Sequence, residues 1–213
     1  MISSYVTQNW ITVIIIFLII LLVLLHYLYK ERFVKFISLV NTNEYFVDYI
    51  NKKASFISFF NGILFFLQLG VYSLLVYLIS LNLSNSKIEL FGFYKITTIL
   101  FLFFIGRYLI GKLISFIFGI DKIQGVLSFV KFTYFSKVAI YLFPLVIIIF
   151  FIPQYKNGLL LVTSGTLIVV LLFFYGKLVL QNQKLIFRNL FYFILYLCTL
   201  EIIPLVYLYR TIF

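Results

Sequence analysis

Two charged residues lie inside long apolar stretches, and they are the first candidates for chemistry. Arg107 lies near the middle of residues 96–118, and Glu201 lies at a similar depth in residues 190–209. A charge at the centre of a bilayer costs about 2.5–3.5 kcal/mol on insertion scales, and an opposite charge offsets part of that cost. We therefore expect Arg107 and Glu201 to form an intramembrane pair. The pair could be structural, or it could line a path for protons or ions.

A row of small residues follows Arg107 along the same stretch. Gly111, Ser115 and Gly119 come at four-residue steps, so all four residues share one face of a helix. Small residues at this spacing let another helix backbone approach closely. The face is predicted to pack against another helix of the chain or against a second copy, and the sequence does not separate these two interpretations.

The remaining polar residues in apolar stretches carry weaker signals. Asn61 and Gln68 are seven residues apart and are predicted to hydrogen-bond to neighbouring helices. His26 and Cys198 are the sole histidine and cysteine, too few to form a metal site. The sequence contains no nucleophile elbow, zinc-protease helix or P-loop motif. We expect no catalytic residues, no cofactor and no enzymatic activity.

Composition indicates where these residues sit. Of 213 residues, 64% are hydrophobic and 11% are charged, whereas a soluble domain has about 45–50% and about 25%. A chain this apolar is typical of a protein that is embedded in lipid. A helix that spans the membrane needs about 20 apolar residues. We predict an all-α, polytopic helical bundle that forms one integral membrane domain over residues 1–213. The six predicted spans cover residues 11–29, 58–81, 96–118, 138–152, 158–175 and 190–209.

The distribution of charge predicts an orientation. The formal net charge is +11, and the basic residues lie between apolar runs, which favours contact with anionic lipid over nucleic acid. Loops after the first, third and fifth spans carry eleven Lys and Arg residues, against four on the other side. Cytoplasmic loops are the basic ones. Both termini are therefore predicted to be periplasmic.

Two of the basic loops contain helical patterns of their own. In the first, apolar residues recur at helical spacing between lysines and an arginine, and Asn41 with Glu44 resembles a capping box that starts a second short helix. The apolar residues of the first pattern are Phe33, Phe36, Ile37 and Val40. Basic amphipathic helices beside spans usually lie in the membrane interface. We expect these residues at the membrane surface, as an anchor or as a docking surface for a partner.

The loop after the third span is predicted to repeat this arrangement. Asp121 is a candidate cap, and Gln124 stands three residues later. The apolar stripe that follows the cap consists of Ile123, Val126, Leu127 and Val130. A second interfacial helix is expected here, ahead of a short fourth span.

The last apolar stretch carries a recognisable signature. Residues 195–204 read LYLCTLEIIP. This resembles the closing signature of a family of polytopic inner-membrane proteins from Bacteroidota, catalogued as a domain of unknown function. The residues that match the signature are Tyr196, Leu197, Cys198, Leu200, Glu201, Ile202 and Pro204. The resemblance implies an inner-membrane location in a diderm bacterium and supplies no activity.

Two functions are consistent with these features. One is a non-enzymatic accessory or structural subunit in cell-envelope assembly or secretion, with a membrane-protein partner or as a homo-oligomer. The alternative is a small transporter or channel in which Arg107 and Glu201 line the path. A water-accessible cavity that reaches Arg107 would favour transport, and a dry, packed interior would favour the subunit.

Overall fold

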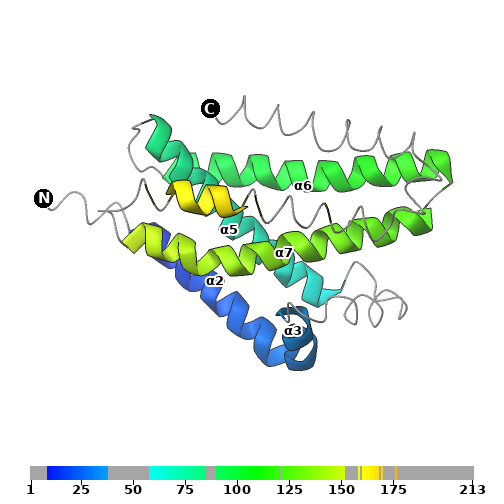
Figure 1. The fold of residues 1–213 in the computed structure, drawn as a ribbon, viewed down its shortest axis with the longest axis horizontal. Coiled ribbons are helices and arrows are strands. Elements are labelled where there is room, and N and C mark those ends of the chain that lie inside the picture. Colours follow the sequence, from blue (N-terminus) through cyan, green and yellow to red (C-terminus); the bar gives the residue numbers. More distant parts are fainter. Residues whose placement is uncertain are drawn as a thin grey trace, which may run out of the picture.

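The computed structural model describes residues 9–37, 58–84, 90–119 and 121–151, together with residues 158, 160–167, 169 and 176. The regular structure in these residues is entirely helical (Figure 1). Four helices are long and apolar enough to cross a membrane: α2 (Asn9–Leu28), α5 (Phe59–Ser84), α6 (Leu90–Phe118) and α7 (Asp121–Phe151). The chain is therefore a multi-pass integral membrane protein.

The predicted spans agree with these helices to different degrees. The stretches 11–29 and 58–81 agree with α2 and α5 except for one end residue each, and the stretch 96–118 lies within α6. Residues 160–167, within the predicted fifth span, are helical. The predicted sixth span, 190–209, lies outside the described residues, so the count of six stays a prediction.

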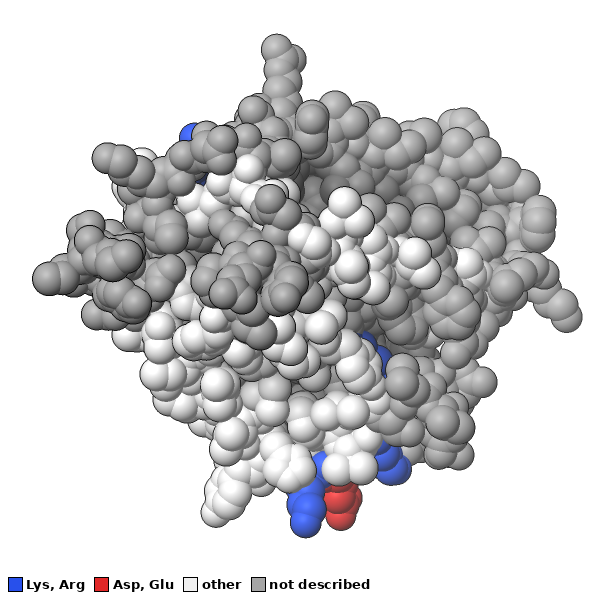
Figure 2. All heavy atoms as spheres, turned by 60° about the vertical axis from the view of Figure 1, so that its left-hand side comes forward, with Lys and Arg blue, Asp and Glu red and all other residues white. Residues whose placement is uncertain are grey.

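Helix α5 is the central element of the described bundle. It packs against α2, α6 and α7, while consecutive long helices run in opposite directions (Figure 1). Within the apolar windows, 67% of α5 is buried, against 22% of α2 and 18% of α6. Most of the described surface is accordingly uncharged, as Figure 2 shows. Lipid is the natural solvent for the exposed sides of α2 and α6.

Close approach between α2 and α5 depends on a glycine. A Cβ atom added to Gly70 would lie 2.5 Å from Cδ2 of Leu18, closer than real side-chain atoms come. Leu18 is buried in the same contact. The small residue that brings two spans together in this part of the bundle is thus Gly70, which the sequence pattern did not single out.

The short helix α3 (Lys30–Ile37) follows α2 after a one-residue turn at Tyr29. The predicted helix is confirmed as far as Ile37, and the second short helix from Asn41 lies outside the described residues. The predicted surface position of the aromatic side chains is wrong for Phe33 and Phe36, which are buried in the protein core. Phe36 packs edge-on against Phe60 of α5, with ring centroids 6.0 Å apart. The apolar face therefore faces protein, because α5 offers it a closer apolar surface than the headgroup layer does.

The prediction of a separate interfacial helix after the third span is wrong. Gly119, with a φ of 66°, ends α6 in the left-handed conformation that glycine adopts readily. Helix α7 then begins at Asp121, as the cap predicted, but it continues unbroken to Phe151. The predicted fourth span is thus only its second half. Nothing between residues 126 and 143 is a glycine or proline that would break the helix, and Lys131 and Lys137 are buried by neighbouring side chains.

Candidate ligand pocket

A cavity of about 320 Å³ lies between α5, α6 and α7. Its described lining combines polar and aromatic side chains, in a volume typical of small-molecule sites. The polar residues are Ser58, Asn61, Gln68, Arg107, Tyr108, Ser128 and Lys131. The aromatic residues are Phe65, Phe66, Phe104, Phe132 and Phe135. The described part of the lining contains two cations and no carboxylate.

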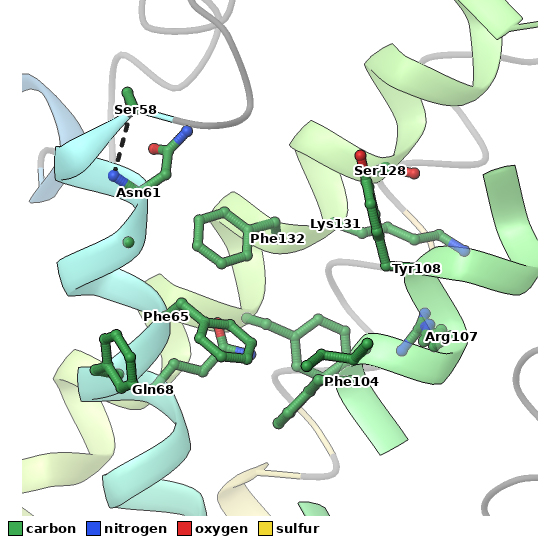
Figure 3. A pocket seen from close by; sticks show the side chains of 14 residues that line it. Ser58, Asn61, Phe65, Gln68, Phe104, Arg107, Tyr108, Ser128, Lys131 and Phe132 are labelled. Atoms are coloured by element: carbon green, nitrogen blue, oxygen red, sulfur yellow. Dashed lines mark hydrogen bonds between the residues drawn. The ribbon is translucent and has the colours of Figure 1, made fainter. Parts of the chain in front are cut away.

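Most polar residues of the cavity lie toward one end of its three helices, and most phenylalanines lie toward the other. Along α5, Ser58 and Asn61 precede the phenylalanines, and along α7, Ser128 and Lys131 do so as well. Helix α6 runs the other way, and there Arg107 follows Phe104. Most of the polar groups therefore lie toward one end of the cavity, whereas Gln68 lies among the phenylalanines at the other. Figure 3 shows Ser58, Asn61 and Ser128 at one side and Phe65 and Phe104 at the opposite side.

The start of α5 organises the polar end. The backbone N–H of Asn61 donates to Oγ of Ser58 at 3.4 Å, so Ser58 caps the helix. Arg32 of α3 donates from Nη2 to Oδ1 of Asn61 at 3.2 Å and from Nη1 to Oγ of Ser58 at 3.5 Å. Its guanidinium also lies 4.2 Å from the ring centre of Phe60. Helix α3 is thus joined to residues that line the cavity.

The two cations come from the helices opposite α5. Arg107 is half-buried, and its guanidinium carbon lies 5.4 Å from the ring centre of Phe135, within range of a cation–π contact. Lys131 is only 7% exposed although it carries an ammonium group. Lys131 was assigned to a cytoplasmic loop by its charge, but its stem is packed in helix α7.

The floor and the mouth of the cavity are formed by different helices. Phe66 of α5 is 59% exposed and Ile105 of α6 is 36% exposed, whereas the lining residues of α7 are buried or half-buried. The cavity therefore opens between α5 and α6, with α7 behind it. Deep inside, Ser136 of α7 donates to Oε1 of Gln68 at 2.8 Å. That hydrogen bond satisfies the amide oxygen and ties the floor to α5.

An aromatic cluster lies at the far end of α5 and α6, where α2 joins them. Trp10 of α2 packs against Tyr77 of α5 and Phe93 of α6, with centroid distances of 5.6 and 5.4 Å. Tryptophan and tyrosine gather at membrane–water interfaces. At about 1.5 Å per residue, Asn61 lies about 24 Å from Tyr77 and Arg107 about 21 Å from Phe93 along their helices. Since the hydrocarbon core is about 30 Å thick, the polar end lies close to the opposite interface.

Lys137 lies one and a half turns further along α7 than Lys131 and outside the cavity. It is 1% exposed, and its ammonium nitrogen lies 5.6 Å from the ring centre of Phe36. Close by, the hydroxyl of Tyr141 donates to the carbonyl oxygen of Ile37 at 2.7 Å. These contacts attach α3 to α7. The prediction that Lys137 is a loop residue is wrong, because α3 covers it.

The structure brings together some of the residues singled out in the sequence. Arg107, Asn61 and Gln68 all line the cavity. Arg107 lies nearer the polar end than the expected mid-depth, since α6 begins six residues before the predicted span. Glu201 and the matched signature residues Tyr196, Leu197, Cys198 and Pro204 lie outside the described residues. The Arg107–Glu201 pair therefore stays a prediction.

The small residues of α6 have separate positions. Gly111 and Ser115 are buried, and the hydroxyl of Ser115 donates to the carbonyl oxygen of Lys112 at 2.8 Å. Gly119 ends the helix. The choice between a neighbouring helix and a second copy as the partner of this face stays open. His26 lies apart from the cavity, 5.6 Å from the ring of Phe33, and the described residues contain no group of three or more His, Cys, Asp and Glu that could hold a metal ion.

Sequence reasoning missed Ser58, Ser128 and Lys131 as members of one site. Each precedes an aromatic residue on its helix, at the same end of the bundle. That pattern is visible in the sequence only when the true start of α7 is known. The incorrect loop between residues 119 and 138 concealed it.

Comparison with protein families identifies one match. The family described as a domain of unknown function (DUF4271) matches residues 11–212. The chain therefore belongs to this family, whose description names no activity. Comparison with curated proteins gives no match, and comparison with solved structures gives none.

Proposed function

We propose that this protein binds an anionic ligand in the α5–α6–α7 cavity and acts as a small membrane carrier without enzymatic activity. The observation that supports the proposal is that the cavity reaches Arg107 and adds a second cation, Lys131, from another helix. Guanidinium and ammonium groups are the usual donors to carboxylate and phosphate oxygens. A dry, tightly packed interior around Arg107 would have favoured a structural subunit instead.

The polar end provides further anion donors. The start of α5, where the helix dipole is positive, lies at this end, although the backbone N–H groups of Asn61 and Gly62 already donate to Ser58. The hydroxyl groups of Tyr108 and Ser128 complete the described polar lining. These groups suit an anion that exchanges part of its hydration for directed hydrogen bonds.

Monodecyl phosphate titrated into the purified full chain in a neutral maltoside detergent would test anion binding. We expect a rise in melting temperature of about 5–10 °C at a hundred-fold excess over the dissociation constant. Arg107→Gln and Lys131→Gln should each reduce the rise. Lys112→Gln is the matched control, because Lys112 is exposed on α6 outside the cavity. An equal rise in all four proteins would refute binding in this cavity.

The proposed setting is the inner membrane of a diderm bacterium, with both termini periplasmic. Lys131 and Lys137 no longer count as loop residues, but the loop after α3 still contributes Lys52 and Lys53 to the side expected to be cytoplasmic. A C-terminal alkaline phosphatase fusion after Phe213 should be active and a fluorescent protein fusion there should be dark. The reverse pattern would invert the orientation.

A role as an accessory subunit in envelope assembly or secretion is a second candidate. It is favoured by the exposed apolar sides of α2 and α6, which give a partner protein or a second copy room to pack. Affinity purification of the tagged chain in mild detergent would reveal a stoichiometric partner. Recovery of the chain alone, as a monomer, would count against this role.

A further inference from the structure

We infer that the ligand of the cavity is an anionic phospholipid, drawn sideways from the leaflet that borders the polar end. The inference rests on the proposed function, because it names the class of anion that the cavity binds. The proposed ligand is a membrane lipid and not a water-soluble phosphate, although both present the same phosphate oxygens.

The polar end of the cavity lies close to the membrane interface. Asn61 lies about 24 Å along α5 from the aromatic cluster at the other interface, less than one hydrocarbon thickness of about 30 Å. A phosphate bound by Arg107 and Lys131 would therefore lie just below the headgroup layer. Long basic side chains reach such a position by extending along apolar surface. A lipid would need only a small displacement to bring its phosphate there.

The other end of the cavity is lined mainly by aromatic side chains. Phe65 and Phe104 line the deeper part of the cavity together with Gln68, and a free phosphate ion would leave their aromatic surface uncovered (Figure 3). An acyl chain of the same lipid would cover that surface. From the interface inward the lining changes from cations and hydroxyl groups to mainly aromatic surface, with the amide oxygen of Gln68 already bonded to Ser136, and this order matches the order of groups in a phospholipid.

The mouth of the cavity lies on the side of the bundle from which a lipid can enter. The exposed lining residues Phe66 and Ile105 belong to neighbouring spans, so the mouth lies on the side of the bundle that faces lipid. Gly62 is exposed at this mouth, and a Cβ atom added there would meet no atom within 4 Å. The open space at Gly62 gives a lipid a lateral route, and it also allows the route to be closed by substitution.

The test uses the full chain in nanodiscs of phosphatidylcholine containing a minor share of phosphatidylglycerol. After extraction into neutral detergent, native mass spectrometry counts the lipids that each protein retains. Wild type should retain phosphatidylglycerol in preference to phosphatidylcholine. In the double variant Arg107→Gln/Lys131→Gln, the ratio of retained phosphatidylglycerol to phosphatidylcholine should be about tenfold lower. The control Lys30→Gln/Lys112→Gln removes the same charge from exposed positions and should behave as wild type.

Gly62→Leu tests the route without touching the charges. It should lower phosphatidylglycerol retention as the charge variant does, whereas Gly62→Ala should retain more than Gly62→Leu. Normal retention by Gly62→Leu and by the charge variant would overturn the inference. In a parallel arm, inorganic phosphate is titrated into nanodiscs of phosphatidylcholine alone. Stabilisation there that depends on Arg107 and Lys131, without lipid preference, would overturn the lipid and keep the anion function. No response in either arm would overturn both.

Discussion

The two ends of the described bundle share α5 and α6 but are built in different ways. At one end, the rings of Trp10, Tyr77 and Phe93 pack against one another between α2, α5 and α6. At the other end, α3 and the start of α5 present hydrogen-bond donors and acceptors around a cavity. Aromatic packing buries apolar area, whereas the cavity end also holds two cations, Arg107 and Lys131, on separate helices. Under the proposed function, the first end holds the helices together and the second end binds the ligand.

The largest expected effect concerns the predicted partner of Arg107. Arg107→Leu and Glu201→Leu should each lower the yield of folded protein in detergent, because either change leaves one charge unpaired. Each single variant should lose about 3 kcal/mol of unfolding free energy. This is the lower end of the range for breaking a buried ion pair, because Arg107 is half-buried. The double variant should recover part of the yield. Strictly additive losses in a double-mutant cycle would show that the two residues do not interact.

The second effect tests the packing that holds both ends together. Gly70→Ile should destabilise the bundle by about 1–3 kcal/mol, because its side chain would displace Leu18 of α2. Gly62→Ala, at an open position of the same helix, is the control and should be neutral or slightly stabilising. Thermal unfolding followed by circular dichroism measures both. A melting temperature for Gly70→Ile equal to that of Gly62→Ala would mean that α2 does not approach α5 as described.

The third effect separates the polar end from the aromatic end. Arg32→Gln removes two hydrogen bonds and a contact with the ring of Phe60, and should cost about 1–2 kcal/mol. Lys35→Gln is the control on the exposed side of the same short helix. Limited proteolysis after residue 37 would report the release of α3. Equal protection of the two variants would argue against a stabilising role for Arg32.

The smallest effect is expected at the aromatic end. Trp10→Leu keeps the site apolar and removes two ring contacts, which together stabilise the bundle by about 1 kcal/mol. The variant should melt slightly lower and bind monodecyl phosphate as wild type does. Loss of ligand binding in this variant would contradict the separation of the two ends.

Most of the described fold could be predicted from the sequence, and the errors have a common cause. Three spans could be predicted from long apolar runs, because the length and hydropathy of such a run are enough to identify a membrane-spanning helix. The positions of Lys131 and Lys137 could not be predicted, because a lysine usually marks a loop unless tertiary contacts cover it. Phe36 lies over Lys137, and that contact joins segments about one hundred residues apart. The burial of Phe33 and Phe36 was misjudged for the same reason.

Parts of the candidate site were visible in the sequence. Arg107 was recognisable because a charge in an apolar run is costly, and Asn61 and Gln68 because polar residues in spans need partners. Their assembly with Lys131 was not predictable, since it depends on α7 beginning at Asp121 and packing against α5. Pattern analysis finds the polar residues of single helices, and the register between helices decides which of them meet.

The central claim is that the cavity between α5, α6 and α7 holds an anion at its polar end. An electron cryo-microscopy map of the full chain in nanodiscs that contain phosphatidylglycerol tests it most directly. The account predicts density between Arg107 and Lys131, continuous with an elongated feature along Phe65 and Phe104. A cavity closed by side chains, with no density between the two cations, would contradict it.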